Sequence, residues 1–187
     1  MTGALVAVVG PSGAGKDAVI DQAREHFACE ERVLFPQRVI TRPAGAGEEH
    51  LPASEEEFTK LAETGGFAMR WQAHGLSYGV PVRVAGAVHD GAVAVVNVSR
   101  AVLDGLSSVF PAVRVVRVTV PEEVRRARIL SRGRENTDAA LARLNRADPA
   151  PEFPVDLEII NDGPLQASGD ALVRFVDDVL VGDRARV

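Results

Sequence analysis

A short apolar run near the N-terminus leads directly into a glycine-rich segment, and this junction constrains the fold more than any other feature of the chain. The run Ala4–Val9 contains no polar residue, which is typical of a strand buried in a parallel sheet. Residues 10–17 then read Gly-Pro-Ser-Gly-Ala-Gly-Lys-Asp, and a helical stretch extends from about Gly15 to Phe27. Seven of these eight positions fit the pattern Gly-x-x-x-x-Gly-Lys-[Ser/Thr] in its required context of strand, loop and helix. The junction therefore predicts a phosphate-binding loop (P-loop).

The predicted loop has the chemistry that a nucleotide polyphosphate requires. Its glycines permit backbone geometries that side chains would block, so the loop N–H groups can turn inward around an anion at the positive end of a helix. Lys16 would reach the β and γ phosphates, and it is one of only two lysines among 21 basic residues. A glycine-rich turn that merely joins strand to helix is the structural alternative. The loop residues expected to contact ATP are Gly10, Pro11, Ser12, Gly13, Ala14, Gly15, Lys16 and Asp17.

Asp17 departs from the pattern, which has Ser or Thr at this position to ligate Mg²⁺ through a hydroxyl. A carboxylate is a charged oxygen ligand that could hold Mg²⁺ directly or through water. Negative charge is also favourable at the start of a helix. We therefore expect Asp17 to be the metal ligand, and a loop that no longer binds nucleotide is the competing interpretation.

Apolar runs alternate with helical patterns along the rest of the chain. Strand-like runs recur at residues 91–98, 113–120 and 157–160, and helical stretches at 100–109, 122–131, 138–147 and 164–180. This alternation predicts an α/β P-loop NTPase fold, with a parallel sheet covered by helices on both faces. A chain of 187 residues suits one domain, whose core we assign to residues 1–34, 82–121 and 149–187.

Two segments interrupt the alternation. Residues 35–81 contain a capping-box pattern at Ser54–Glu57, a helix to about Glu63 and a strand at 67–73, which predicts a small α+β insertion able to hold a second substrate. Residues 122–148 are rich in arginine, and Arg125, Arg128 and Arg132 share one helix face by their spacing. Such a face is usually solvated, but beside a P-loop we expect it to close over ATP as a helical lid.

Composition excludes several classes of function. The net charge of −5 disfavours non-specific binding to nucleic acid or to an anionic membrane. A single cysteine rules out an intrachain disulfide and a cysteine-built zinc site. No apolar run reaches the ~18 residues that span a bilayer, and no basic segment precedes the first apolar run as in a signal peptide. We expect a cytoplasmic protein, with the oligomeric state, a homodimer included, left open.

The order and spacing of several motifs resemble the guanylate kinase-like P-loop phosphotransferases over nearly the whole chain. Besides the loop, the matching segments are Thr41-Arg42-Pro43 with Gly47-Glu48, Phe67–Trp71, His74–Gly79, Arg128-x-x-x-Arg132-Gly133 with Arg143-Leu144, and Ile159–Asp162. Guanylate kinases carry a Glu that reads the guanine edge where this chain has Arg70, and Asp-x-Asp where it has Asn97-Val-Ser99. Arg presents donors only, so the pocket is unsuited to guanine.

These departures resemble a second family, the ribose 1,5-bisphosphate phosphokinases of phosphonate metabolism. Its motifs match Asp17, Thr41–Ala44, Trp71–Gly79 and Arg132–Glu135, of which the Trp-to-Gly run is the most specific. The resemblance implies that ATP and ribose 1,5-bisphosphate give ADP and 5-phosphoribosyl 1-diphosphate, with Mg²⁺ as the metal. The residues then implied in catalysis are Lys16, Arg42, Arg128, Arg132 and Arg143. Arg42 and Tyr78 match family positions that bind substrate, and we also expect Arg38, Arg70, His74 and Asn97 to bind it, with a plain salt bridge as the alternative role of Arg38 and Arg70. Asn161 is expected near the adenine.

Two rival functions remain open at this point. The chain could be a guanylate kinase or another small kinase of nucleotides or sugar phosphates, which a screen of acceptors by ADP release would separate. It could also be a non-catalytic guanylate kinase-like module that binds a nucleotide or a partner. The intact lysine and glycines of the loop argue against that module.

Overall fold

A five-stranded parallel sheet forms the centre of the computed structural model, which describes residues 2–44, 50–131 and 153–184. Its strand order is β2-β7-β1-β8-β9, and every neighbouring pair is parallel. The strands are β1 (Ala4–Val9), β2 (Val33–Leu34), β7 (Val93–Asn97), β8 (Val113–Thr119) and β9 (Leu157–Ile160). The predicted parallel sheet is therefore confirmed, with β1 at its centre.

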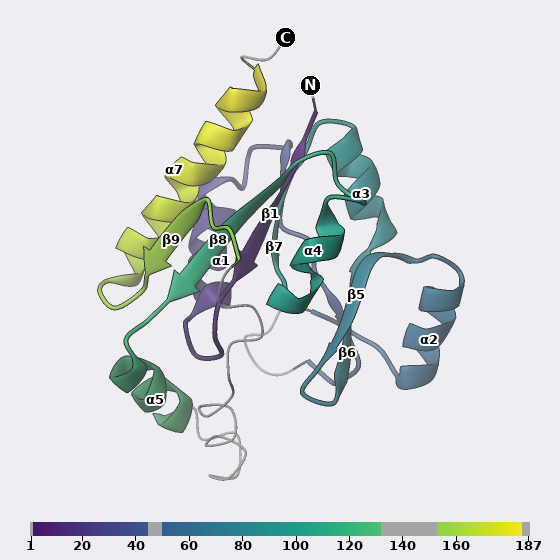
Figure 1. The fold of residues 1–187 in the computed structure, drawn as a ribbon, viewed down its shortest axis with the longest axis horizontal. Coiled ribbons are helices and arrows are strands. Elements are labelled where there is room, and N and C mark those ends of the chain that lie inside the picture. Colours follow the sequence, from purple (N-terminus) through teal and green to yellow (C-terminus); the bar gives the residue numbers. More distant parts are fainter. Residues whose placement is uncertain (1, 45–49, 132–152, 185–187) are drawn as a thin grey trace.

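Helices cover both faces of this sheet (Figure 1). One face carries α1 (Lys16–His26) and α7 (Leu165–Arg184), and the other carries α3 (Val82–His89) and α4 (Leu103–Leu106). Strand β1 serves both faces, because Val6 and Val8 belong to the core under α1 and α7, whereas Leu5 and Ala7 belong to the core under α3 and α4. The uninterrupted apolar run of β1 follows from this double burial.

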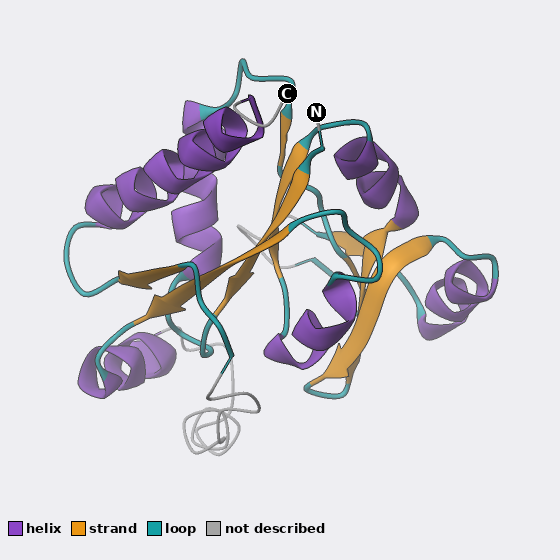
Figure 2. Ribbon diagram, turned by 45° about the horizontal axis from the view of Figure 1, so that its top comes forward, coloured by secondary structure: helices purple, strands orange, loops and turns teal. Residues whose placement is uncertain are grey.

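A second sheet of four strands lies beside the α3 and α4 face (Figure 2). Its order is β4-β3-β6-β5, with β3 (Val39–Ile40), β4 (Leu51–Pro52), β5 (Phe67–Ala73), β6 (Leu76–Pro81) and the helix α2 (Glu55–Glu63). Met69 and Val80 from this sheet are buried in the same cluster as Leu5 and Val84. The α+β character expected for residues 35–81 is thus present, and its sheet is anchored on the core.

Several elements differ from the sequence-based expectation. Helix α3 and strand β6 were not predicted, because Val82–His89 has three valines and a glycine that disfavour a helix, while glycine and proline interrupt β6. Burial of Val84 and Val88 against the sheet stabilises α3 despite its weak propensity. The helix expected at 100–109 is a single 3-10 turn, η1 (Arg100–Val102), followed by the short α4, and α7 ends four residues later than expected.

The arginine-rich segment begins with α5 (Glu122–Ser131), which follows β8 and lies at the carboxyl edge of the central sheet (Figure 1). The helix expected at 138–147 and the predicted residues Gly47, Glu48, Arg132 and Arg143 lie outside the described residues. Within the residues that the structure describes, no helix has the length and apolar character needed to cross a bilayer.

Candidate active site

The loop between β1 and α1 has the backbone that the sequence predicts for a P-loop. Gly10 and Gly15 both have positive φ angles, 149° and 86°. A Cβ at Gly10 would collide with the carbonyl oxygen of Val118, and one at Gly15 would lie 2.5 Å from the side-chain nitrogen of Asn161. Both positions therefore require glycine, for conformation and for space.

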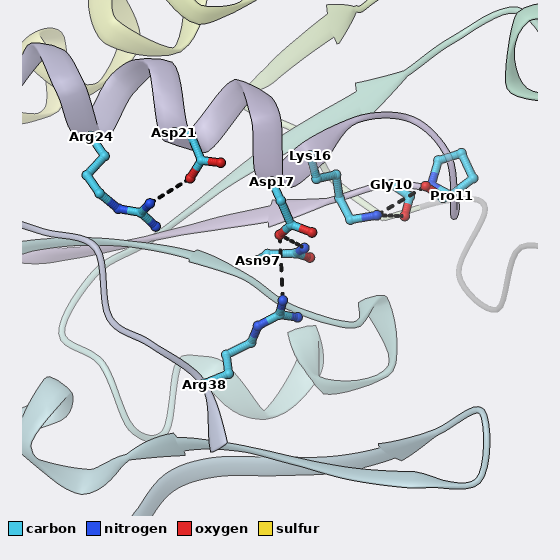
Figure 3. Close-up of polar contacts among 8 residues, drawn as sticks. All are labelled: Gly10, Pro11, Lys16, Asp17, Asp21, Arg24, Arg38 and Asn97. Carbon is cyan, nitrogen blue, oxygen red and sulfur yellow. Dashed lines mark hydrogen bonds and ion pairs between the residues drawn. The ribbon is translucent and has the colours of Figure 1, made fainter. Parts of the chain in front are cut away.

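Lys16 folds back across this loop. Its Nζ donates hydrogen bonds to the carbonyl oxygens of Gly10, at 2.8 Å, and Pro11, at 3.1 Å (Figure 3). The ammonium group thus lies over the loop at the N-terminal end of α1. Loop N–H groups, a helix N-terminus and a lysine that converge in this way fit the polyphosphate of a nucleotide.

Asn161 fixes the loop from within the protein. Its Nδ2 donates to the carbonyl oxygen of Ala14 at 2.9 Å, and its Oδ1 accepts a hydrogen bond from Ser168 at 3.1 Å. Both side chains are buried, at 3% and 5% exposure. Asn161, expected near the adenine, therefore holds the loop through Ala14. Its partner Ser168 was not predicted, because a serine inside a helix carries no motif.

Asp17 lies where three segments distant in sequence meet. Asn97, at the end of β7, donates from Nδ2 to Oδ1 of Asp17 at 2.7 Å. Arg38, just before β3, places Nη2 3.6 Å from the same oxygen (Figure 3). The side chain of Asp17 remains 74% exposed, and the contacts of Asn97 and Arg38 both engage Oδ1, so neither of them occupies Oδ2.

The side chains around Asp17 fit Mg²⁺ better than a metal ion that is ligated by protein side chains alone. Among the residues that the structure describes, no group of three or more His, Cys, Asp or Glu side chains could hold a metal ion. Mg²⁺ is usually bound through one or two carboxylates together with substrate phosphates and waters. Asp17 supplies such a carboxylate beside the lysine of the P-loop.

Arg38 connects this centre to the second sheet. Its guanidinium carbon lies 6.0 Å from the ring centre of Tyr78, and Tyr78 stacks on Trp71 with ring centres 5.4 Å apart and planes 5° from parallel. Trp71 and Tyr78 are paired residues of the β5–β6 hairpin. Of the predicted substrate residues, the structure thus brings Arg38, Tyr78 and Asn97 together around Asp17.

Arg42 leaves β3 next to the same hairpin. Thr41 and Ser77 hold this segment, since Thr41 N donates to Ser77 O at 3.1 Å and Ser77 N donates to Thr41 Oγ1 at 2.8 Å. The carbonyl oxygen of Arg42 lies 3.2 Å from Nε2 of the buried His50. The half-buried Arg42 therefore starts from a fixed backbone close to Tyr78.

Two predicted residues lie elsewhere on the hairpin. Arg70 is exposed and alternates with Met69 and Trp71, which pack on the core, so it projects from the opposite face of β5. His74 has a φ of 58° and forms the exposed two-residue turn with Gly75. The structure does not bring either side chain to Tyr78.

The start of the predicted lid reaches the P-loop. A Cβ at Gly15 would lie 3.7 Å from Nη1 of Arg128, so this guanidinium is beside the N-terminus of α1. Arg132 and Arg143, the other two lid arginines, belong to the segment outside the described residues.

Comparisons with known proteins agree with this geometry. No family model matches the chain. A protein of Pseudofrankia inefficax named "Ribose 1,5-bisphosphate phosphokinase PhnN" is 52% identical over 94% of this chain and 92% of its own length. A protein of the same name from Rhizobium etli is 39% identical over 95% and 91%. The crystal structure of guanylate kinase from Anaplasma phagocytophilum superposes with a TM-score of 0.68 at 18% identity, over 94% of this chain and 85% of that one. That structural likeness establishes the fold alone.

Proposed function

Because the chain belongs to the ribose 1,5-bisphosphate phosphokinase PhnN family, we propose that it transfers the γ-phosphoryl group of ATP to the 1-phosphate of ribose 1,5-bisphosphate. The products are ADP and 5-phosphoribosyl 1-diphosphate. In the reaction one P–O bond of ATP breaks and one forms to an oxygen of the acceptor phosphate. The observation that carries this proposal is the contact of Arg38 with Asp17, which joins the P-loop to the acceptor sheet.

The acceptor oxygen is already anionic near neutral pH, so the reaction needs little help from a general base. The protein must position two polyanions and offset their repulsion. Lys16 supplies a cation over the P-loop, and Arg128 supplies another at the start of α1. Arginine suits this task because its planar fork binds phosphate oxygens in pairs.

Asp17 is the proposed ligand of Mg²⁺. When bound, the ion would supply positive charge that neutralises the nucleotide phosphates. Asn97 and Arg38 both contact Oδ1, so they orient the carboxylate while Oδ2 remains able to bind the ion. Asn97 thereby contributes by holding a ligand in place rather than as a ligand itself.

The acceptor site is proposed on the face of the second sheet that carries Tyr78. Arg38 lies over the ring of Tyr78, and Arg42 leaves the neighbouring strand, so the two arginines and the phenol can hold one phosphate of a sugar bisphosphate. Arg70 takes no part in this set because it projects from the other face. A guanine base would require acceptor groups, and the Asp-x-Asp of guanylate kinases is Asn97-Val-Ser99 in this chain.

The deciding experiment compares two acceptors with saturating Mg-ATP. We expect kcat/KM for ribose 1,5-bisphosphate to exceed that for GMP by several orders of magnitude, since a site with unmatched buried polar groups discriminates by roughly 10⁴-fold or more. Phosphorus NMR should show a diphosphate attached at C1 of the sugar. A preference for GMP would instead assign guanylate kinase activity, and absence of ADP release with every acceptor would assign a non-catalytic nucleotide-binding module.

A further inference from the structure

A cavity of about 290 Å³ opens beside the P-loop, on the side away from α1. Its walls are formed by Pro11, Arg100, Arg117, Thr119, Val120, Glu122 and Arg125. Its size is near the lower end of the range for small-molecule sites, roughly 300–1,000 Å³. Three arginines and one glutamate line it, so its walls carry an excess of positive charge.

The three arginines come from three different elements. Arg100 begins η1, just after β7, where the Ser99 side chain accepts a hydrogen bond from Ala101 N. Arg117 lies in β8, two residues before its carboxyl end, and Arg125 lies one turn into α5. The carboxyl ends of parallel strands are where ligands bind in α/β sheets. The cavity therefore occupies a normal ligand position of this fold.

The electrostatics of the cavity favour an anion. Burial lowers the pKa of Arg100, and the nearby positive charge of Arg117 lowers it further. Two half-buried guanidinium groups thus repel each other in an environment where water screens them poorly. A phosphate group would offset this repulsion and accept several hydrogen bonds from both.

The cavity also adjoins the reaction centre. Pro11 forms part of its wall, and the carbonyl oxygen of Pro11 accepts a hydrogen bond from Lys16 Nζ at 3.1 Å. An anion in the cavity would consequently lie next to the phosphates that Lys16 binds. The nucleotide already has the loop N–H groups and Lys16, whereas the bisphosphate acceptor has a second phosphate beyond the one assigned to Arg38, Arg42 and Tyr78.

We propose that Arg100, Arg117 and Arg125 form a site for the 1-phosphate of the sugar bisphosphate, the group that accepts the phosphoryl group of ATP. This inference rests on the proposed function and deepens it, because it names a second arginine cluster that handles the acceptor. Arg117 had a visible signal in the sequence, a charged residue inside the otherwise apolar strand run 113–120.

The test uses Arg100→Gln and Arg117→Gln in the full chain, with Arg114→Gln as the matched control on the same strand. We expect each cavity variant to raise the KM for ribose 1,5-bisphosphate roughly 10- to 100-fold, the effect of losing a charge-assisted hydrogen bond, with the KM for ATP within about twofold of wild type. Arg114→Gln should leave both constants unchanged. A rise in the KM for ATP alone would assign the cavity to a nucleotide phosphate and overturn the acceptor assignment, and two unchanged constants would overturn the site itself.

A binding measurement separates this inference from the proposed function. Calorimetry with inorganic diphosphate, after a non-hydrolysable Mg-ATP analogue has filled the P-loop, should show binding to wild type and a roughly tenfold or greater loss in both cavity variants. If wild type bound diphosphate in this way but did not phosphorylate ribose 1,5-bisphosphate, the reaction would be wrong and the anion site would stand. Equal diphosphate affinity in wild type and both variants would refute the site. If Arg117→Gln fails to fold, the diphosphate affinities of Arg100→Gln and of the conservative variant Arg117→Lys are compared with that of wild type instead.

Discussion

The Nδ2 atom of Asn97 lies 2.7 Å from Oδ1 of Asp17 and donates a hydrogen bond to it across 80 residues of sequence. The contact joins the end of β7 to the first turn of α1, directly after the P-loop lysine. Asp17 is 74% exposed and would otherwise sample several rotamers, so Asn97 selects one of them. Its amide replaces a carboxylate that would repel Asp17 at this distance.

Asn97→Ala should therefore weaken the binding of Mg²⁺ and leave the fold intact. We expect the Mg²⁺ concentration for half-maximal turnover to rise roughly 10- to 100-fold, as for loss of a partner that orients a metal ligand. The measurement is turnover against free Mg²⁺ at saturating ATP and acceptor. Gln166→Ala removes a comparable amide–carboxylate contact, 2.8 Å to Asp170 on α7, and should leave the Mg²⁺ curve unchanged. An unchanged curve for Asn97→Ala would remove Asn97 from the metal site.

Lys16→Ala should abolish most turnover and leave the protein folded. Lys16 Nζ donates to the carbonyl oxygens of the loop residues Gly10 and Pro11, and its side chain belongs to neither apolar core cluster, so no apolar core is lost. One electrostatic donor aimed at developing charge contributes about 10²- to 10³-fold to kcat. Lys60→Ala, on the exposed surface of α2, is the control with the chain's other lysine. Steady-state kinetics and circular dichroism decide the question, and near-normal turnover in folded Lys16→Ala would refute the P-loop assignment.

Local sequence patterns predicted the parts of the fold in which neighbouring residues set the structure. The junction of β1, loop and α1 is one such part, and the capping box of α2 is another. There Glu57 N donates to Ser54 Oγ at 3.2 Å, and Ser54 N donates to the Glu57 carboxylate at 2.7 Å. Strand β7 was found because it is an apolar run buried in a parallel sheet, and β8 and β9 were found because apolar residues dominate them despite Arg114, Arg117 and Glu158.

Contacts between distant segments could not be predicted in the same way. The approach of Arg38 to Asp17 depends on how the second sheet docks against the core through Met69 and Val80, and no local pattern encodes that docking. Helix α3 forms against its own propensity because tertiary burial outweighs it. We expected Arg70 to bind substrate from its charge and its place in the insertion, but the alternation of β5 decides which face that side chain takes.

Asn161→Ala should destabilise the protein and loosen the P-loop together. It would leave the carbonyl oxygen of Ala14 and the hydroxyl of Ser168 without their buried partner, at a cost of about 1–3 kcal/mol in the free energy of unfolding. The KM for ATP should rise, because the loop backbone that binds phosphate is no longer fixed. Urea denaturation and ATP titration measure the two effects. Ser168→Ala removes only the hydroxyl and should cost less on both measures, and an unchanged stability in Asn161→Ala would contradict the role assigned here.

Arg128→Ala should slow turnover while hardly changing the melting temperature. The guanidinium lies beside Gly15 and the start of α1, where it can meet a nucleotide phosphate, and its partly exposed position contributes only ~0–1 kcal/mol to folding. The control is Arg126→Ala, which removes the same positive charge from the exposed side of this helix. It should leave kcat near wild type. Parallel melting curves and ATP kinetics of the two variants are compared. A large drop in melting temperature for Arg128→Ala alone would show that this arginine holds α5 in place, so that the loss of activity would follow from the fold and the lid role would be wrong.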